Sequence, residues 1–149
     1  MSLNLMMDEF CSVYRVKAAP VTKKELESTA DLLFEEANEL LEEANKPVIN
    51  TEDSGFELVD SIYVAAQRLR RMGFDVDGML AAKHASNMSK TVSRAHAAYE
   101  LQVARERYPE AYIDEGQNYC VLRDAATNKV IKPTSYTKAK AKQEHLPHA

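Results

Sequence analysis

The chain has 149 residues, of which 45% are hydrophobic and 28% charged, with a formal net charge of −4. This is the composition of an ordinary globular domain, and its acidic balance argues against a nucleic-acid partner. No stretch approaches the roughly 18 consecutive apolar residues of a membrane span. The opening residues MSLNLMMDEF lack the basic and apolar regions of a signal peptide. We therefore expect a cytoplasmic protein that does not bind a membrane.

Helical patterns dominate the first half of the chain. Apolar residues at helical spacing predict three helices, over about 3–16, 22–45 and 56–72. The second opens on a capping-box pattern, TKKE, in which Thr22 caps the amide of Glu25. Between the second and third helices, the turn-rich NTEDSG at 50–55 is expected to be a loop. Gly73 is suited to end the third helix.

The second half changes character along its length. Asp75 or Asp77 can cap a fourth helix that runs through GMLAAKHASNMSK, and a further helical stretch over 93–113 is broken by Pro109. Two short β-type runs, NYCVLRD and KVIKP, predict a hairpin over about 118–133. We expect one domain over 1–137, followed by a loose polar tail over 138–149.

Five glutamates occupy nine positions of the second helix, at 35, 36, 39, 42 and 43. At about 100° per residue they lie opposite the helix's apolar arc. Such a pattern alone predicts a solvated face. Glu42 and Glu43 keep that interpretation.

The third helix is harder to explain by solvation, because apolar residues surround its first three turns and predict burial. Glu57 and Asp60 share one face of it, and two carboxylates in such a place repel each other unless a cation neutralises them. Arginines at 68, 70 and 71 could serve. A divalent cation could also serve if Glu36 and Glu39 faced this pair, because Mg²⁺ and Mn²⁺ prefer four or more oxygen ligands.

The motif EEANE, followed seventeen residues later by ELVD, resembles the EExxE…ExxD signature of the all-α nucleoside triphosphate pyrophosphohydrolases. That superfamily includes MazG-like proteins, dimeric dUTPases and phosphoribosyl-ATP pyrophosphohydrolase. KHASNMSK resembles the segment that contacts substrate phosphates in these families, and NKVIKPTSY the hairpin that closes a phage-type branch. MDEFCSVYRV is similar to the opening helix of the same branch. The resemblance covers most of the chain.

This resemblance implies an all-α fold, a MazG-like four- to five-helix bundle with a small C-terminal β-hairpin. It implies a hydrolase acting on phosphoric anhydrides that converts a (d)NTP to a (d)NMP and pyrophosphate, as in nucleotide-pool sanitation. Mg²⁺, with Mn²⁺ as a substitute, would be held by four carboxylates, those of Glu36, Glu39, Glu57 and Asp60. Substrate phosphates would be bound by Lys83, Asn87 and Lys90. Glu35 would orient or deprotonate the attacking water, or would simply be solvated.

Two other functions fit the same residues. The same metal site would serve a phosphoribosyl-ATP pyrophosphohydrolase, and a non-enzymatic helical interaction module would pair its carboxylates with arginines of its own or of a partner. The apolar third helix also predicts a homodimer or a dimer of dimers. Lys129 and Lys132 either reach phosphates or keep the edge of the hairpin soluble.

Overall fold

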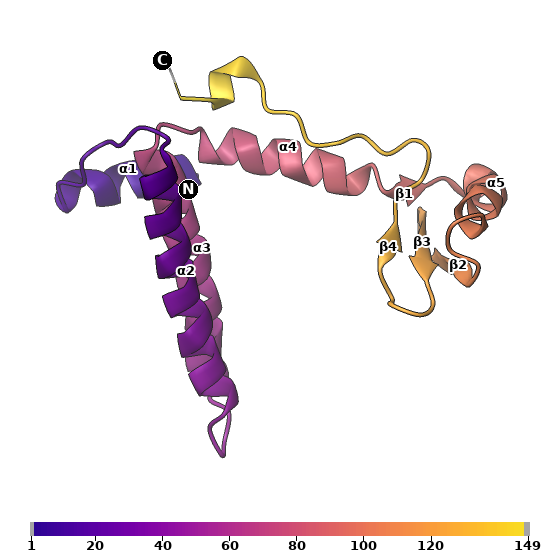
Figure 1. Cartoon of the computed structure of the whole chain (residues 1–149), viewed down its shortest axis with the longest axis horizontal. Coiled ribbons are helices and arrows are strands. Elements are labelled where there is room, and N and C mark those ends of the chain that lie inside the picture. Colours follow the sequence, from indigo (N-terminus) through magenta and orange to yellow (C-terminus); the bar gives the residue numbers. More distant parts are fainter. Residues whose placement is uncertain (1, 148–149) are drawn as a thin grey trace. The chain divides into compact units, whose positions relative to one another are not determined.

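Residues 2–147 are described by the computed structural model, and within them the chain forms five α-helices and a four-stranded sheet. They fall into two units (Figure 1). The first comprises the residues up to Met79 together with those from Ala141 onward, and the second comprises Leu80–Lys140. A mainly helical chain with a C-terminal hairpin was the sequence expectation, and the structure agrees at that level.

A helical hairpin is the main feature of the first unit: α2 (Lys23–Ala44) and α3 (Thr51–Arg71) lie side by side, joined by a short loop (Figure 1). Thr22 caps α2 as expected, its hydroxyl accepting from the amide of Glu25 at 3.2 Å. The expected loop over 50–55 is wrong. Asn50 caps α3 through its side-chain oxygen, which accepts from the amide of Glu52 at 3.0 Å, so the helix begins at Thr51.

A buried ion pair fixes the two helices of the hairpin against each other. The Arg68 guanidinium, on a residue that is 7% exposed, donates to Glu25 at 2.8 Å and to the Ser28 hydroxyl at 2.7 Å. Arg71 approaches the same Glu25 carboxylate at 3.2 Å. Glu25 therefore does not close the reciprocal half of a capping box, because its carboxylate is directed at α3.

Two helix N-termini cap each other beside the hairpin. In α1 (Leu3–Val13) the amides of Leu3 and Asn4 donate to the Asp77 carboxylate at 3.0 and 3.2 Å. In return Asn4 accepts from the amide of Val76 at 2.8 Å, at the start of α4 (Val76–Met88). Negative charge at a helix N-terminus is favourable. The small core of this unit lies beside these caps and consists of Met7, Ala66 and Val76, with Leu3, Met6, Tyr63 and Leu69 packed around it.

The segment after residue 138, expected to be a loose tail, contributes to the first unit. Its residues Gln143–His145 form a short 3-10 turn. The carbonyl of His145 accepts from the amide of Asp75 at 3.1 Å, and Pro147 lies against Gly73. Gly73 itself has a φ of +86°, which agrees with its expected role in ending α3.

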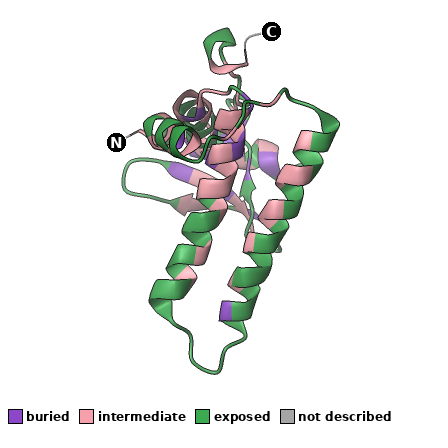
Figure 2. Ribbon diagram, turned by 90° about the vertical axis from the view of Figure 1, so that its left-hand side faces the viewer, coloured by how far each residue is buried: buried purple, intermediate pink, exposed green. Residues whose placement is uncertain are grey.

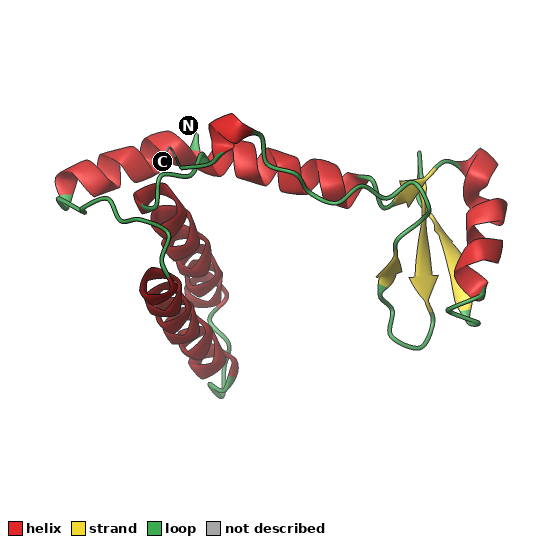
Figure 3. Cartoon of the chain, turned by 45° about the horizontal axis from the view of Figure 1, so that its top comes forward, coloured by secondary structure: helices red, strands yellow, loops and turns green. Residues whose placement is uncertain are grey.

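The second unit contains the larger part of α4 and a small sheet covered by one further helix (Figure 3). The expected hairpin is present as β3 (Cys120–Asp124) paired with β4 (Val130–Ile131). Two strands were not expected: β1 (Thr91–Val92) and β2 (Ala111–Glu115), both antiparallel to β3. The helical prediction over 93–113 is thus wrong beyond Arg105, where α5 (Arg94–Arg105) ends. Apolar side chains of α5, β1 and the sheet form this unit's core: Val92, Ala97, Ala104, Ala111, Cys120, Leu122 and Ile131.

The helical hairpin is more exposed than the sequence predicted (Figure 2). On α3, Phe56 is 59% and Ile62 58% exposed, and the fully buried positions of this helix are Ala66 and Arg68. The predicted burial of its first three turns is therefore wrong for the single chain. The reason is geometric, since α2 covers only one side of α3 there. None of the helices among residues 2–147 combines the length and the apolar character needed to cross a membrane.

We expect Arg68→Met to lower the free energy of unfolding by about 3 kcal/mol, because Arg68 is buried and its loss leaves the largely buried Glu25 carboxylate with Arg71 alone. Urea titration followed by helical circular dichroism measures this. Lys23→Met is the matched control: it breaks an exposed pair with Glu27 at 3.5 Å and should cost less than about 1 kcal/mol. Equal losses in the two variants would contradict the role given to the buried pair.

Candidate metal centre

The register set by Glu25 and Arg68 brings glutamates of α2 and α3 together. Glu36 lies eleven residues after Glu25, and Glu57 lies eleven residues before Arg68. In an antiparallel pair of helices, equal steps from a fixed contact lead to facing positions. One carboxylate oxygen each from Glu36, Glu39 and Glu57 lie within 4.8 Å of one another. Three of the four predicted metal ligands are therefore adjacent.

Like charge dominates the electrostatics of this cluster. Burial raises the pKa of Glu36, and the negative charges of Glu39 and Asp60 raise it further. Burial and the adjacent Glu39 carboxyl likewise raise the pKa of Glu57. One carboxylate oxygen of Glu57, Oε2, is shielded from solvent and has no hydrogen-bond partner among the described residues. Such a group is stabilised by a proton or by a cation.

No salt bridge fills that role among residues 2–147, although Lys46, which pairs with Glu43, is near enough for the charge of Glu57 to raise its pKa. Arg68 and Arg71 pair with Glu25, and Arg70 pairs with Asp8 at 2.6 Å. None of the four predicted ligands has a salt bridge within the described part of the chain. The alternative in which the chain's own arginines neutralise these carboxylates is therefore wrong for this structure.

Asp60 and Glu35 lie at the margin of the cluster. Asp60 is exposed and is not one of the three carboxylates with mutually close oxygens, yet its charge raises the pKa of both Glu36 and Glu57. It sits one helical turn from Glu57 on the same face of α3. Glu35 is exposed, and its charge contributes to the raised pKa of Glu36. Glu35 is thus near the cluster without belonging to it.

Glu43 differs from its prediction as a residue of a solvated face. It is buried and contacts Lys46, and its negative charge contributes to the raised pKa of Glu57. A signal was available, because Glu43 follows Glu36 by seven residues and so lies on the same face of α2. Glu42 is exposed, as expected.

The predicted phosphate-binding residues belong to the second unit. Lys83 and Asn87 are exposed on α4, and Lys90 follows its end, donating to the Asn87 side chain at 2.9 Å. The hydrogen bond with Ser86 lowers the pKa of Tyr136, and the positive charges of Lys132, Lys90 and Lys83 lower it further. These lysines therefore share one electropositive neighbourhood within their own unit. The lysines and the carboxylate cluster belong to separate units.

Comparisons with known proteins give no match: no protein-family model fits the chain, and neither a curated protein nor a solved structure is significantly similar to it.

Divalent metal should stabilise the folded chain through this cluster. We expect millimolar Mn²⁺ or Mg²⁺ to raise the melting temperature by mass action, at constant ionic strength. Without metal, Glu57→Gln should also raise it, because the change removes one of the repelling charges and supplies an amide donor for Glu39. The same variant should respond less to metal. Differential scanning calorimetry measures both effects.

Glu42→Gln is the matched control, since it removes the same charge from the exposed face of α2. It should leave the metal response unchanged. A melting temperature that is equally insensitive to metal in the wild type and in Glu57→Gln would contradict a metal centre here.

Proposed function

We propose that the protein is a cytoplasmic Mg²⁺-dependent nucleoside triphosphate pyrophosphohydrolase with a MazG-like helical core, which hydrolyses a (d)NTP to a (d)NMP and pyrophosphate. The observation that carries the proposal is that Glu36 and Glu39 on α2 face Glu57 on α3, while none of the three forms a salt bridge among the described residues. An acidic cluster attracts a triphosphate only through metal ions. The order and spacing of EEANE and ELVD, which resemble the superfamily signature, add to this support.

The donor set fits a hard divalent cation. All of its members offer carboxylate oxygens, and the solvent-shielded Oε2 of Glu57 is an acceptor without a partner in the described chain. Glu36, Glu39, Glu57 and Asp60 would hold the metal. Bound Mg²⁺ would neutralise the phosphate charge and lower the pKa of a coordinated water. Mn²⁺ suits the same oxygen ligands.

Other side chains would orient the reactants. Glu35 is exposed beside the cluster, where its carboxylate could accept a proton from the attacking water. Lys83, Asn87 and Lys90 are the proposed donors to phosphate oxygens, as the resemblance implies. Attack at the α-phosphorus breaks the bond to the bridging oxygen, which departs with the β- and γ-phosphates as pyrophosphate. The water oxygen remains on the monophosphate.

The exposed apolar side chains of the hairpin support a homodimer or a dimer of dimers. They include Phe34 and Leu41 on α2 and Phe56, Leu58, Val59 and Ile62 on α3, each at least half exposed. A surface of this kind on a monomer favours association. A second copy of the hairpin is the proposed partner, since closed symmetric dimers are the commonest assemblies of identical chains.

Pyrophosphate release from a panel of dNTPs tests the enzymatic proposal. With Mg²⁺ we expect release at pH 7 to 8, no release in EDTA, and a loss of about 100-fold or more in Glu39→Gln and Asp60→Asn, because each substitution removes a charged ligand. Glu42→Gln should retain wild-type activity. Activity that survives both ligand substitutions would exclude this site, and phosphoribosyl-ATP, added to the panel, would reveal the narrower alternative.

The oligomeric proposal predicts that Ile62→Lys converts the assembly to monomers, because a charge would then be buried in an apolar contact. Size-exclusion chromatography with light scattering measures the mass. Leu5→Lys is the matched control, since Leu5 is equally exposed, at 63%, but lies on α1. A wild-type chain that elutes as a monomer at micromolar concentration would contradict the proposal directly.

A further inference from the structure

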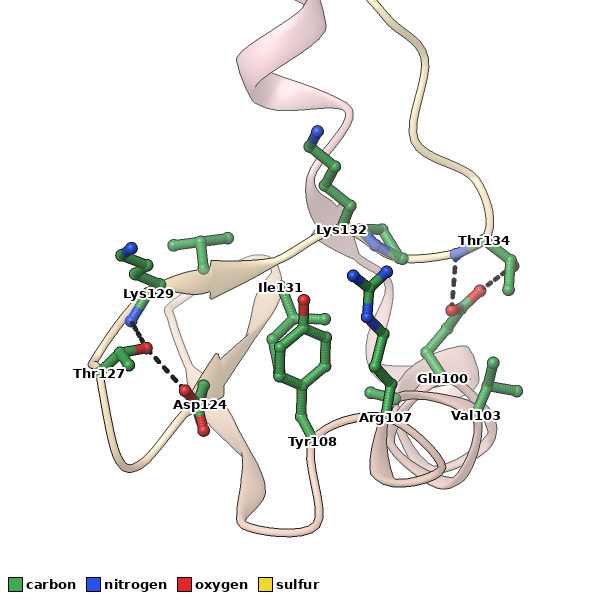
Figure 4. A pocket seen from close by; sticks show the side chains of 13 residues that line it. Glu100, Val103, Arg107, Tyr108, Asp124, Thr127, Lys129, Ile131, Lys132 and Thr134 are labelled. Carbon is green, nitrogen blue, oxygen red and sulfur yellow. Dashed lines mark hydrogen bonds between the residues drawn. The ribbon is translucent and has the colours of Figure 1, made fainter.

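A cavity of about 630 Å³ lies in the second unit, between the end of α5 and the segment that contains β4 (Figure 4). All its lining residues fall within Leu80–Lys140, so this unit forms it alone. Its size is that of small-molecule sites in proteins. Neither the resemblance to pyrophosphohydrolases nor the carboxylate cluster gives it a role.

Three cations line this cavity: Arg107, Lys129 and Lys132. None of them forms a salt bridge within residues 2–147. The Arg107 guanidinium lies 5.7 Å from the centre of the Tyr108 ring, and both side chains extend from the end of α5 toward the segment that carries Lys132 (Figure 4). The ammonium of Lys132 lies 4.7 Å from the centre of the Tyr136 ring. Two of the three cations therefore lie near aromatic rings, and none of the three pairs with a carboxylate of the described residues.

Two carboxylates also line the cavity, and each accepts hydrogen bonds from a threonine. Glu100 is buried and accepts from the amide of Thr134 at 2.8 Å as well as from its hydroxyl. Asp124 accepts from the Thr127 hydroxyl at 2.6 Å. These hydrogen bonds hold the chain on either side of β4 and direct the carboxylates at the protein (Figure 4). Both carboxylates keep their negative charge, so the lining carries three cations against two anions, a net formal charge of +1.

The charge of the whole unit favours an anion as well. Leu80–Lys140 contains ten Lys and Arg against six Asp and Glu, a formal charge of +4, whereas the rest of the chain carries −8. Lys83 and Lys90 extend the positive neighbourhood of Lys132 around Tyr136. A potential of this sign concentrates anions near the cavity.

The wall of the cavity is apolar. Ala104 and Ile131 are buried residues of the unit's core, and Val103 and Val130 lie beside them in the lining. A ligand consisting of phosphate alone would leave this surface unused. The combination of an apolar wall, aromatic rings and unpaired cations suits a molecule with a flat or apolar part and a phosphate group.

We propose that the cavity between α5 and β4 binds an organic phosphate monoester, with the phosphate attracted by the unpaired cations of its lining and the organic part against Val103, Ala104 and Ile131. This site needs no metal, because its own side chains neutralise the phosphate. It is independent of the carboxylate cluster of the first unit and of the proposed hydrolysis.

Isothermal titration calorimetry of the full chain in EDTA tests this proposal, since EDTA removes metal-dependent binding. The probes are AMP, adenosine and inorganic phosphate. AMP is a suitable probe because it combines a phosphate with a flat base, and an apolar wall does not distinguish one base from another. We expect AMP to bind more tightly than either of its parts, and Arg107→Gln and Lys132→Gln each to weaken it about tenfold.

Lys138→Gln is the matched control, because it removes one positive charge from an exposed position of the same unit that does not line the cavity. It should bind AMP like the wild type, and so should Glu39→Gln, in which the proposed metal centre is disabled. The proposal is overturned if AMP binds no better than phosphate or adenosine. It is also overturned if Lys138→Gln weakens AMP as much as Arg107→Gln does, or if the loss occurs in Glu39→Gln instead.

Discussion

The buried contact between Glu25 and Arg68 is the constraint on which the first unit depends. Arg68 approaches Glu25 at 2.8 Å and also donates to Ser28, so α3 cannot slide along α2 without leaving a charge buried and unpaired. Three helical turns separate Glu25 from Glu36 and Glu57 from Arg68. The ion pair at one end of the hairpin therefore determines which carboxylates face each other further along it.

The far part of the hairpin has little else to hold it. The core of the unit, around Met7 and Val76, lies near the ion pair, while Phe34 and Phe56 stay exposed. The facing glutamates repel each other, as the raised pKa of Glu57 indicates. The exposed apolar side chains and the repelling carboxylates thus lie in the same part of the hairpin, and both destabilise it. A divalent cation would relieve the repulsion, and a second copy of the hairpin would cover the apolar surface.

Local signals in the sequence were sufficient to predict the helices and the face that Glu57 shares with Asp60. The cap of α2 by Thr22 and the end of α3 at Gly73 depend on neighbouring residues only, and both are confirmed. The start of α3 was missed because NTEDSG is equally suited to a turn and to a capped first helical turn. Asn50 decides between them by its hydrogen bonds.

Long-range pairing could not be predicted in the same way. The strands β1 (two residues) and β2 exist because β3 pairs with them, and neither has a pattern of its own that distinguishes it from a helix end. The burial of α3 was overestimated for a related reason: periodicity shows which residues are apolar, and only the fold shows what covers them. Glu43 is likewise buried beside Lys46, and its charge contributes to the raised pKa of Glu57, which periodicity alone does not show.

The two units have opposite chemistry, and this separates the two candidate sites. The first unit, at −8, would attract a phosphate only after a cation has neutralised its carboxylates. The second, at +4, presents Arg107, Lys129 and Lys132 to a phosphate directly. Metal dependence is consequently a property of one site and not of the chain. A phosphate compound that binds in the absence of metal therefore reports on the cavity of the second unit, while one that needs metal reports on the carboxylate cluster.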